Sequence, residues 1–374
     1  RWYAWCDRLG LMVWQDMPSG DRSIGPNDPV VARNAASSLQ FEVEFHSIID
    51  GLQNHPSVVA WVPFNEGWGQ YETARIARFV RQKDPTRWLD AVSGWVDRPV
   101  GQMLDIHAYP GPAIPPLDAK RAAVLGEFGG LGLPVEGHTW QEKKNWGYRS
   151  YDTTDALTSA YEQLITNLRP MIGDGLNAAI YTQVSDVEIE VNGLLTYDRA
   201  VLKMDADRVR EINQKLFLPA PNFYPVLEDA EDSPRDWNFT IDVPADDWMK
   251  PEFDDSKWNR AQAGFGTPGT PGSVVRTVWD SKQIWLRRAF GWAGPPLGVL
   301  HLRIHHDEDC QVYLNGVLIA DLKGYITGYV LVPLRPEHMD LLNTTLNVIA
   351  ATCTQTGGGQ YLDLGLIQIE ELPQ

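Results

Sequence analysis

Six short apolar segments recur along the first half of the chain, and their pattern constrains the fold more than any other feature. They are residues 11–16, 58–64, 88–92, 103–109, 122–128 and 177–184. Their apolar residues are continuous rather than alternating, which is typical of parallel strands covered on both faces. Helical patterns lie between several of them, and in residues 41–52 one apolar stripe consists of Phe41, Phe45, Ile48, Ile49 and Leu52. Similar stripes occupy residues 71–82 and 155–172. Strands that alternate with helices predict a parallel α/β sheet or barrel.

The pattern changes after residue 218. Residues 219–225 form a proline-rich linker, and the following segments read as short strands separated by turns. One of these turns is Asn315-Gly316, a pair that favours a tight β-hairpin. We therefore expect an α/β domain over residues 1–218 and an all-β, sandwich-like domain over residues 226–374.

The charge and the cysteine content exclude several classes of function. The net charge of −17 argues against nucleic acid and anionic lipid as partners, because both require clustered Lys and Arg. Neutral substrates fit better. No apolar run approaches the roughly 18 to 20 residues that a membrane span needs. Cys6, Cys310 and Cys353 are too few and too scattered for a disulfide framework or a zinc site.

The chain is rich in aromatic residues, with 15 tryptophans and 13 tyrosines. Core packing accounts for most of them. Flat apolar faces with a polar edge also suit sugar rings, so the composition is compatible with a carbohydrate ligand.

Polar residues that end apolar strands carry the most information about chemistry, because active sites of parallel α/β folds lie at the carboxyl ends of their strands. The candidates are Asn65 and Glu66, which end one strand, Glu127, which ends another, and Asp16, His107 and Tyr109, which end or follow two more. Two carboxylates at strand ends are the minimum equipment for glycoside hydrolysis.

Structural explanations compete with each of these candidates. A glutamate that ends a strand more often caps a helix or pairs with an arginine, and "GEFGG" (126–130) can be a tight turn. His107 can be a satisfied core histidine, and Trp61, Trp68 and Trp95 can serve packing alone. We interpret "HHDED" (305–309) as a solvated strand end rather than a cation site.

Several motifs resemble glycoside hydrolase family 2, the group of β-galactosidases, β-glucuronidases and β-mannosidases. "YAWCDRLGLMVWQDMP" (3–18) resembles the helix with a Cys-Asp pair that leads into the third barrel strand, and "HPSVVAWVPFNEGWG" (55–69) resembles the fourth strand with its Asn-Glu motif. "MLDIHAYPGP" (103–112), "AAVLGEFGG" (122–130) and the segment 178–199 resemble the sixth, seventh and eighth strands. The match covers about 200 residues with the motifs in the family's order.

This resemblance implies roles for individual residues. Glu66 would be the general acid/base, and Glu127 the nucleophile of a retaining mechanism, with carboxyl groups about 5 to 5.5 Å apart. Asn65 would bind the sugar 2-hydroxyl, and Tyr109 would hydrogen-bond the nucleophile and keep it ionised. The further substrate-binding candidates are Trp68, Trp95, His107 and Asp16. The two glutamates should have pKa values that their environments push apart. The reaction needs no metal and no cofactor.

Relative to the family, the first two barrel strands are absent from this chain. The expected fold is therefore an incomplete TIM-type barrel of about six strands, with an open hydrogen-bonding edge. Three explanations stay open: a fragment of a longer product, a partner chain over the gap, or packing of the C-terminal domain into it. Of these we favour a homo-oligomer or an internal cover. The family's distribution favours a bacterial origin, and no residue indicates a compartment.

The C-terminal domain has a resemblance of its own. "FDDSKWNRAQAGFGTPGTPG" (253–272), "QIWLRRAF" and "VYLNGVLI" resemble a galactose-binding-like jelly-roll module. For this domain we favour a structural role, as a brace, over sugar binding. The chain as a whole predicts a retaining exo-β-glycosidase, with β-galactosides as the single preferred substrate. The alternative is a carbohydrate-binding or weakly active remnant whose incomplete barrel does not turn over efficiently.

Overall fold

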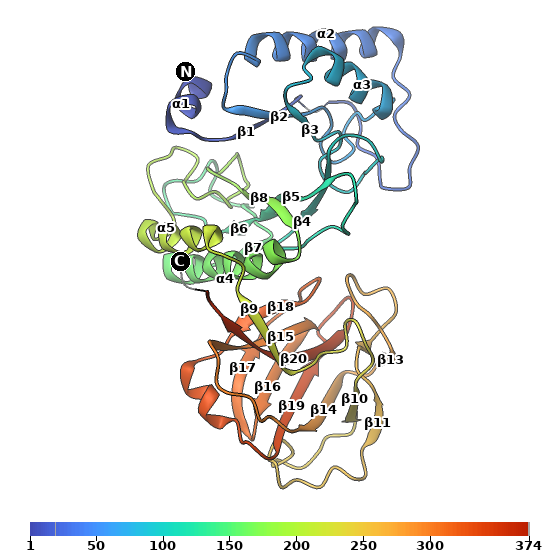
Figure 1. The fold of residues 1–374 in the computed structure, drawn as a ribbon, viewed down its shortest axis with the longest axis vertical. Helices are drawn as coiled ribbons and strands as arrows, with labels where there is room; N and C mark the ends of the chain where they lie inside the picture. The colour runs from blue at the N-terminus through green and yellow to red at the C-terminus, as the bar shows by residue number, and fades with distance from the viewer. Residues whose placement is uncertain (19, 373–374) are drawn as a thin grey trace. The chain divides into compact units, whose positions relative to one another are not determined.

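The computed structural model describes residues 1–18 and 20–372, so the last two residues of the predicted C-terminal domain lie outside the described part. The chain divides into two compact units (Figure 1). Unit 1 consists of Arg1–Leu164 and Met171–Val209, and unit 2 of Ile165–Pro170 and Arg210–Gln374. Within the described residues, no helix has the length and apolar character required to cross a membrane.

The first part of unit 1 is a parallel three-stranded sheet with the order β1-β2-β3. Its strands are β1 (Val13–Asp16), β2 (Val58–Val62) and β3 (Trp88–Leu89). The helices are α1 (Trp2–Leu9), α2 (Ala35–Leu52) and α3 (Thr73–Lys83). The predicted stripe of α2 is confirmed, since Phe41, Phe45 and Ile49 pack with Ile76 of α3 and Trp61 of β2 in one core.

The second part of unit 1 is another parallel three-stranded sheet, with the order β4-β5-β8. Its strands are β4 (Met103–Ala108), β5 (Ala122–Gly129) and β8 (Leu176–Thr182). Residue Gln102 precedes β4 and joins it to β3, because its backbone N–H donates to the Leu89 carbonyl at 2.9 Å. Strand formation is therefore confirmed at all six predicted places, although only Trp88–Leu89 of the predicted 88–92 is regular strand.

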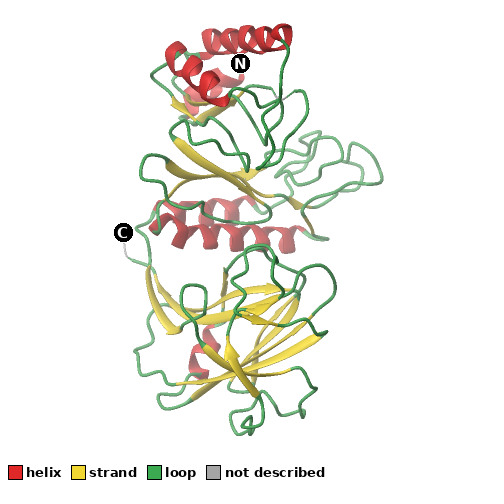
Figure 2. Ribbon diagram, turned by 90° about the vertical axis from the view of Figure 1, so that its right-hand side faces the viewer, coloured by secondary structure: helices red, strands yellow, loops and turns green. Residues whose placement is uncertain are grey.

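Two helices accompany the second sheet and lie side by side in Figure 2. They are α4 (Thr154–Gly173) and α5 (Ala206–Gln214). Arg208 of α5 donates hydrogen bonds to Asp155 at 2.7 Å and to Glu162 at 3.0 Å, both on α4. A short sheet of β6 (Leu131–Gly132) and β7 (Arg149–Ser150) lies beyond β5.

The prediction that every strand is covered on both faces is wrong for β8. Only Leu176 of this strand is buried, and the consecutive residues Ala179 and Ile180 are exposed, Ile180 by 40%. The reason is its position: among the described strands β8 has a single neighbour, β5, so one edge carries no further strand. An apolar run alone does not reveal such an edge.

Unit 2 contains two sheets around one core, and their strands pair antiparallel except for β12 and β13, which are parallel. The first has the order β11-β10-β14-β19-β16-β17, and the second the order β13-β12-β20-β15-β18 with β9 also paired to β20. The strands of the first are β10 (Asp236–Thr240), β11 (Asn259–Gln262), β14 (Gln283–Phe290), β16 (Asp309–Leu314), β17 (Val317–Leu322) and β19 (Asn347–Thr354). The strands of the second are β9 (Asn222–Leu227), β12 (Phe265–Gly266), β13 (Thr277–Val278), β15 (Val299–Asp307), β18 (Val330–Pro333) and β20 (Tyr361–Glu370). Two short 3₁₀ helices complete the elements, η1 (Lys215–Phe217) and η2 (Pro336–Leu341).

The core of unit 2 lies between these sheets. Leu286 and Ile349 from the first sheet join Leu302 and Leu364 from the second in one apolar cluster. Asn315 and Gly316 connect β16 to β17 with φ values of 50° and 86°, which confirms the predicted hairpin turn.

The interpretation of "HHDED" as a solvated strand end is wrong. His305 is 0% exposed and Glu308 is 6% exposed, at the end of β15. Groups from other segments cover them: the His305 ring bonds the Ile326 carbonyl at 3.1 Å, and the Thr356 hydroxyl donates to the Glu308 carboxylate. Coverage by segments distant in sequence leaves no trace in the local pattern.

Candidate active site

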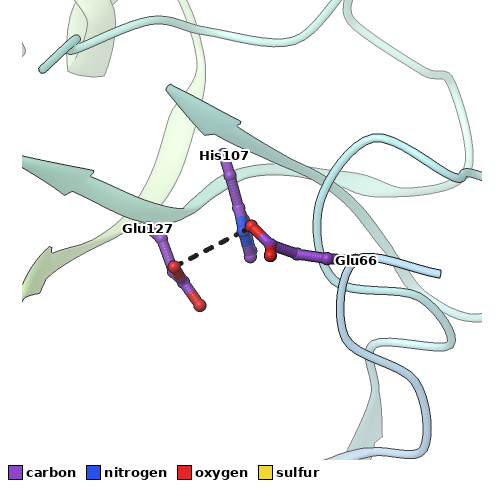
Figure 3. A group of neighbouring side chains, drawn as sticks. All are labelled: Glu66, His107 and Glu127. Carbon is purple, nitrogen blue, oxygen red and sulfur yellow. Dashed lines mark hydrogen bonds and ion pairs between the residues drawn. The ribbon is translucent and has the colours of Figure 1, made fainter. Parts of the chain in front are cut away.

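Two glutamates from the carboxyl ends of strands in the two parallel sheets of unit 1 meet at one site. Glu66 follows β2, and Glu127 lies on β5. Oxygen atoms of both carboxylates and a ring nitrogen of His107 all lie within 4.8 Å of one another (Figure 3). The structure thus brings together the two residues that the sequence singled out for catalysis.

His107 lies between the two carboxylates. It is on β4 and pairs in register with Glu127 on β5, which places the two side chains next to each other. Its Nδ1 lies 2.9 Å from Glu66 Oε1 and 3.5 Å from Glu127 Oε2. The side chain is 0% exposed, and its Nε2 lies 2.8 Å from the Ser93 hydroxyl. His107 is therefore buried, but the partners that satisfy it are the candidate catalytic groups.

Asn65 is held by the segment after β3. The Ser93 hydroxyl donates to Asn65 Oδ1 at 3.0 Å, and the Glu66 backbone N–H donates to the Ser93 carbonyl at 2.9 Å. Within the described part of the chain the Asn65 amide nitrogen makes no hydrogen bond, so it remains available to a ligand. Ser93 was not predicted as a site residue, and nothing in its local sequence distinguishes it.

The backbone at Glu66 adopts an uncommon conformation. Its φ is 52°, in the left-handed region that side chains other than glycine rarely occupy. Gly94 lies directly against it, because a Cβ there would approach His107 Nδ1 to 3.3 Å and Glu66 Cγ to 3.4 Å. Such local strain is typical of functional sites, where the surrounding structure holds a side chain in place.

Tyr109 hydrogen-bonds Glu127 as predicted from the family resemblance. Its hydroxyl contacts Glu127 Oε2 and also lies 3.0 Å from Thr182 Oγ1 at the end of β8. The predicted consequence is only partly found. Burial raises the pKa of Glu127, and although His107 and the Tyr109 hydrogen bond lower it, the net direction is upward. Burial therefore outweighs the hydrogen bond that was expected to keep the carboxylate ionised.

Further carboxyl groups lie beneath this pair. Solvent reaches part of Asp16, yet protein atoms crowd its carboxyl, and this burial together with the charges of Asp90 and Glu127 raises its pKa to about 7. Asp90 and Asp105 are fully buried next to each other. Burial raises the pKa of Asp90 to about 6, while burial and the charge of Asp90 move the pKa of Asp105 far above its usual range.

The glycine before Glu127 is required by this arrangement. A Cβ at Gly126 would approach Asp105 Oδ2 to 2.1 Å, and the Gly126 N–H donates to Asp105 Oδ1 at 2.8 Å. Asp90 and Asp105 were not predicted as part of the site. The sequence did contain a signal for both residues, because each is an aspartate inside an otherwise apolar segment: Asp90 in "WLDAV" and Asp105 in "MLDIHA".

The predicted aromatic residues divide into two cases. Trp95 contacts His107 edge-on, with ring centroids 6.0 Å apart, and is 46% exposed. Trp68 is 43% exposed, and no described contact joins its ring to the two carboxylates.

Tyr148 and Trp146 were not predicted. Tyr148 stacks on Tyr109 with centroids 3.8 Å apart and contacts Trp146 edge-on at 5.4 Å.

The trio of Glu66, His107 and Glu127 also has the donor atoms of a metal site. Over residues 1–18 and 20–372 it is the one set of three such groups close enough to hold an ion. The acid and nucleophile chemistry that the pair of glutamates supports needs none.

The first part of this chain matches a known protein family. The family model described as "Glycosyl hydrolases family 2, TIM barrel domain" matches residues 1–109. A β-mannosidase B of Aspergillus fumigatus is 36% identical over 87 residues, and one of Emericella nidulans is 34% identical over 87 residues. Each alignment covers 23% of this chain and 10% of the relative, so the match spans about a tenth of the length of these curated relatives.

Solved structures give a broader but weaker similarity. A β-glucuronidase of Bacteroides uniformis aligns with 99% of this chain and 60% of its own, with 12% identity and a TM-score of 0.39. An FMN-binding β-glucuronidase from Facaelibacterium prausnitzii aligns with 99% of this chain and 48% of its own, with 12% identity and a TM-score of 0.40.

The family match ends at Tyr109, so it contains Asn65, Glu66 and His107 but not Glu127. Glu127 is placed beside them by the geometry of β4 and β5. The family resemblance seen in the sequence motifs is thereby confirmed for residues 1–109, which match the TIM barrel domain of glycosyl hydrolases family 2.

Proposed function

We propose that this chain is a retaining exo-β-glycosidase, with Glu66 as the general acid/base and Glu127 as the nucleophile. The observation that carries the proposal is the pair of carboxylates from the ends of β2 and β5, with oxygen atoms within 4.8 Å of one another. Retaining enzymes hold their carboxyl groups about 5 to 5.5 Å apart, whereas inverting enzymes need roughly 6.5 to 9.5 Å to admit a water molecule.

In this mechanism Glu66 protonates the departing oxygen while Glu127 attacks the anomeric carbon, which forms a covalent glycosyl-enzyme. Glu66 then removes a proton from water, and the water attacks the same carbon and releases Glu127. His107 holds the Glu66 carboxylate through Nδ1 and is itself fixed by Ser93. The Asn65 amide lies beside Glu66, where it can donate to the sugar 2-hydroxyl as the transition state develops.

The fold that supports this reaction is, in our proposal, an incomplete TIM-type barrel. Two parallel three-stranded sheets joined at Leu89 and Gln102 supply its strands, and among the described strands β8 has β5 as its single neighbour. The jelly-roll identity of unit 2 is likewise a proposal. Its two largely antiparallel sheets and common core support it.

The sugar has two candidates. β-Galactoside was preferred because that specificity is common in the family. The curated relatives of the 87-residue match are named β-mannosidases, which makes β-mannoside the second candidate.

Hydrolysis of aryl β-glycosides by the wild-type chain, Glu127→Gln and Glu66→Ala tests the proposal. The panel contains galactoside, mannoside, glucoside, glucuronide and arabinoside. We expect one of them to be cleaved, and Glu127→Gln to abolish the cleavage. Incubation with the matching 2-deoxy-2-fluoro glycoside should add one sugar mass to the wild type but not to Glu127→Gln. Cleavage that survives in Glu127→Gln would refute the assignment of the nucleophile.

A second function follows from the exposed edge of β8. A site next to an unpaired strand edge admits water and holds a sugar less firmly. An error of about 1 Å in the position of the sugar can lower the reaction rate about a hundredfold. The alternative is therefore a carbohydrate-binding or weakly active chain. Sugar binding without hydrolysis in the same panel would favour it.

A further inference from the structure

A third glutamate, Glu190, is held firmly in the loop that follows β8. Its Oε1 accepts a hydrogen bond from Asn192 Nδ2 at 2.8 Å, and Asn192 Oδ1 accepts from Gln183 Nε2 at 2.7 Å. Asn192 is 0% exposed, so it acts as a fixed support. Backbone hydrogen bonds between Val187 and Glu190, at 3.0 and 3.1 Å, close the turn that carries Glu190.

Two chains of contacts place Glu190 beside the nucleophile. Gln183 directly follows Thr182, which bonds the same Tyr109 hydroxyl that contacts Glu127. On the other side, the backbone of Trp146 pairs with Glu190 in a parallel bridge, and its N–H donates to the Ile189 carbonyl at 2.9 Å.

Trp146 contacts Tyr148, which stacks on Tyr109. Glu190 also acts electrostatically on the site: burial raises the pKa of both Glu127 and Tyr148, and the negative charges of Glu66 and Glu190 raise both further.

The charges around the site are strongly one-sided. Glu66, Glu127, Glu190 and Asp16 contribute four carboxyl groups. No arginine or lysine of the described chain is among the groups that shift the pKa of Glu127, of Asp16 or of Tyr148. His107, which can carry a positive charge, is already engaged by Glu66 and Glu127. A ligand carboxylate would therefore meet carboxylates without a cation to pair with.

We propose that Glu190 is a specificity-determining residue that excludes glycones carrying a carboxylate, so that the site accepts uncharged sugars. The proposal rests on the proposed glycosidase function and narrows its substrate class. Several similar structures are named β-glucuronidases, and the proposal predicts that this chain does not accept the kind of substrate that those names indicate. The exclusion is electrostatic. In a partly buried site, a ligand carboxylate close to other negative charges loses more binding free energy than a neutral hydroxymethyl group at the same position.

The test compares a sugar with its own uronic acid, since the two differ only at C6. The substrates are the aryl β-glycoside that the panel identifies and the aryl β-glycosiduronate of the same configuration, and the quantity measured is the ratio of their kcat/KM values. Binding of the free sugar and its uronic acid, followed by ligand-observed NMR, gives a readout that does not need turnover; glucose and glucuronate serve if the panel identifies no sugar. The variant is Glu190→Gln, which removes the charge and keeps the shape. Its matched control is Glu188→Gln, because Glu188 lies in the same turn and is exposed.

We expect the wild type to prefer the uncharged partner by more than about tenfold, and Glu190→Gln to reduce this preference by about tenfold. Glu188→Gln should leave the ratio unchanged. A wild type that accepts the uronic acid equally well, or a ratio in Glu190→Gln within about twofold of the wild type, would overturn the proposal.

The two readouts separate the two proposals. If no glycoside is cleaved, the proposed hydrolysis fails, while the NMR ratio still decides the role of Glu190. If neither the sugar nor the uronic acid binds, both proposals fail.

Discussion

The two units of this molecule differ in where buried like charges lie next to each other. In unit 2 two buried or half-buried arginines face carboxylates: Arg287 bonds Asp255 at 2.9 Å, and Arg303 bonds Asp229 and Glu231. In unit 1, Asp90 faces Asp105 and Glu66 faces Glu127. Each unit also has a contrary case: Lys203 bonds Asp186 at 2.6 Å in unit 1, where both side chains are buried, and Asp307 lies beside Glu308 in unit 2. Paired charges satisfy each other and hold a fold together, whereas like charges are maintained only where the rest of the structure supports them. That difference points to unit 1 as the place of chemistry.

The largest effect is expected from breaking a paired charge in unit 2. The Arg287 side chain is 3% exposed, and besides Asp255 it donates to the carbonyls of Trp248, Lys250 and Phe253. Arg287→Ala should lower the free energy of unfolding by about 3 to 5 kcal/mol, because it leaves these acceptors without their donor. Urea denaturation followed by tryptophan fluorescence measures the loss.

Arg260→Ala is the matched control for this change. Arg260 pairs with Asp236 at 3.2 Å, but the side chains are 72% and 50% exposed. An exposed pair contributes about 1 kcal/mol or less. Equal losses for Arg260→Ala and Arg287→Ala would show that burial is not what makes the charges of unit 2 structural.

The next effect concerns the hydrogen bond to the nucleophile in unit 1. Tyr109→Phe removes the hydroxyl that contacts Glu127, so the pKa of Glu127 should rise further. Since the nucleophile must be ionised, the acidic limb of the pH-rate profile should move to higher pH, and kcat should fall by about a hundredfold, or roughly 3 kcal/mol.

Tyr148→Phe serves as the control, because Tyr148 stacks on Tyr109 but makes no described hydrogen bond to Glu127. It should leave the acidic limb in place. A profile for Tyr109→Phe that coincides with the wild type would mean that burial alone sets the ionisation of Glu127.

A smaller effect is expected from relieving the like charges of Asp90 and Asp105. The pKa of Asp90 is raised to about 6 in the folded chain, above its unfolded value. A raised carboxyl pKa contributes stability that is fully present below about pH 4 and is lost as the pH rises through about 6. The wild type should lose about 2 kcal/mol over this window, and Asp90→Asn should flatten the loss. Urea midpoints at pH 4 and pH 7 measure it.

Asp84→Asn gives the contrast of opposite sign. Burial raises the pKa of Asp84, but hydrogen bonds from Thr86 and Trp61 outweigh it, and the net pKa is lowered. Its contribution is present above the unfolded pKa and is lost as the pH falls, so this variant should be more damaging at pH 7 than at pH 3. Two variants with the same pH slope would contradict the picture of a like-charge cluster.

The sequence predicted what depends on near neighbours along the chain. Apolar runs placed six strands, and polar residues at their ends placed Glu66 and Glu127, because parallel strands bring their carboxyl ends to one edge. It also predicted the turn at Asn315 and Gly316, whose conformation is local.

What the sequence did not predict depends on contacts between distant segments. The exposure of Ile180 follows from the absence of a further described strand beside β8, and the burial of His305 follows from backbone around Ile326. Ser93 acquires a role only because the chain after β3 returns to Asn65. The net direction of the pKa of Glu127 is a balance between burial and hydrogen bonding, which residue types alone do not decide.

The smallest effect should come from the aromatic rim of unit 1. Trp95 contacts His107 at its edge and is 46% exposed, so its ring can offer a face to a sugar without holding the core together. Trp95→Ala should raise KM about fivefold, or roughly 1 kcal/mol, and leave kcat unchanged, since binding lost equally from substrate and transition state appears only in KM. Trp88→Ala is the control, because Trp88 is 57% exposed on β3 and no described contact joins it to the carboxylates. A fall in kcat for Trp95→Ala would instead mean that the ring positions His107, and the charged cluster of unit 1 would then extend to its aromatic rim.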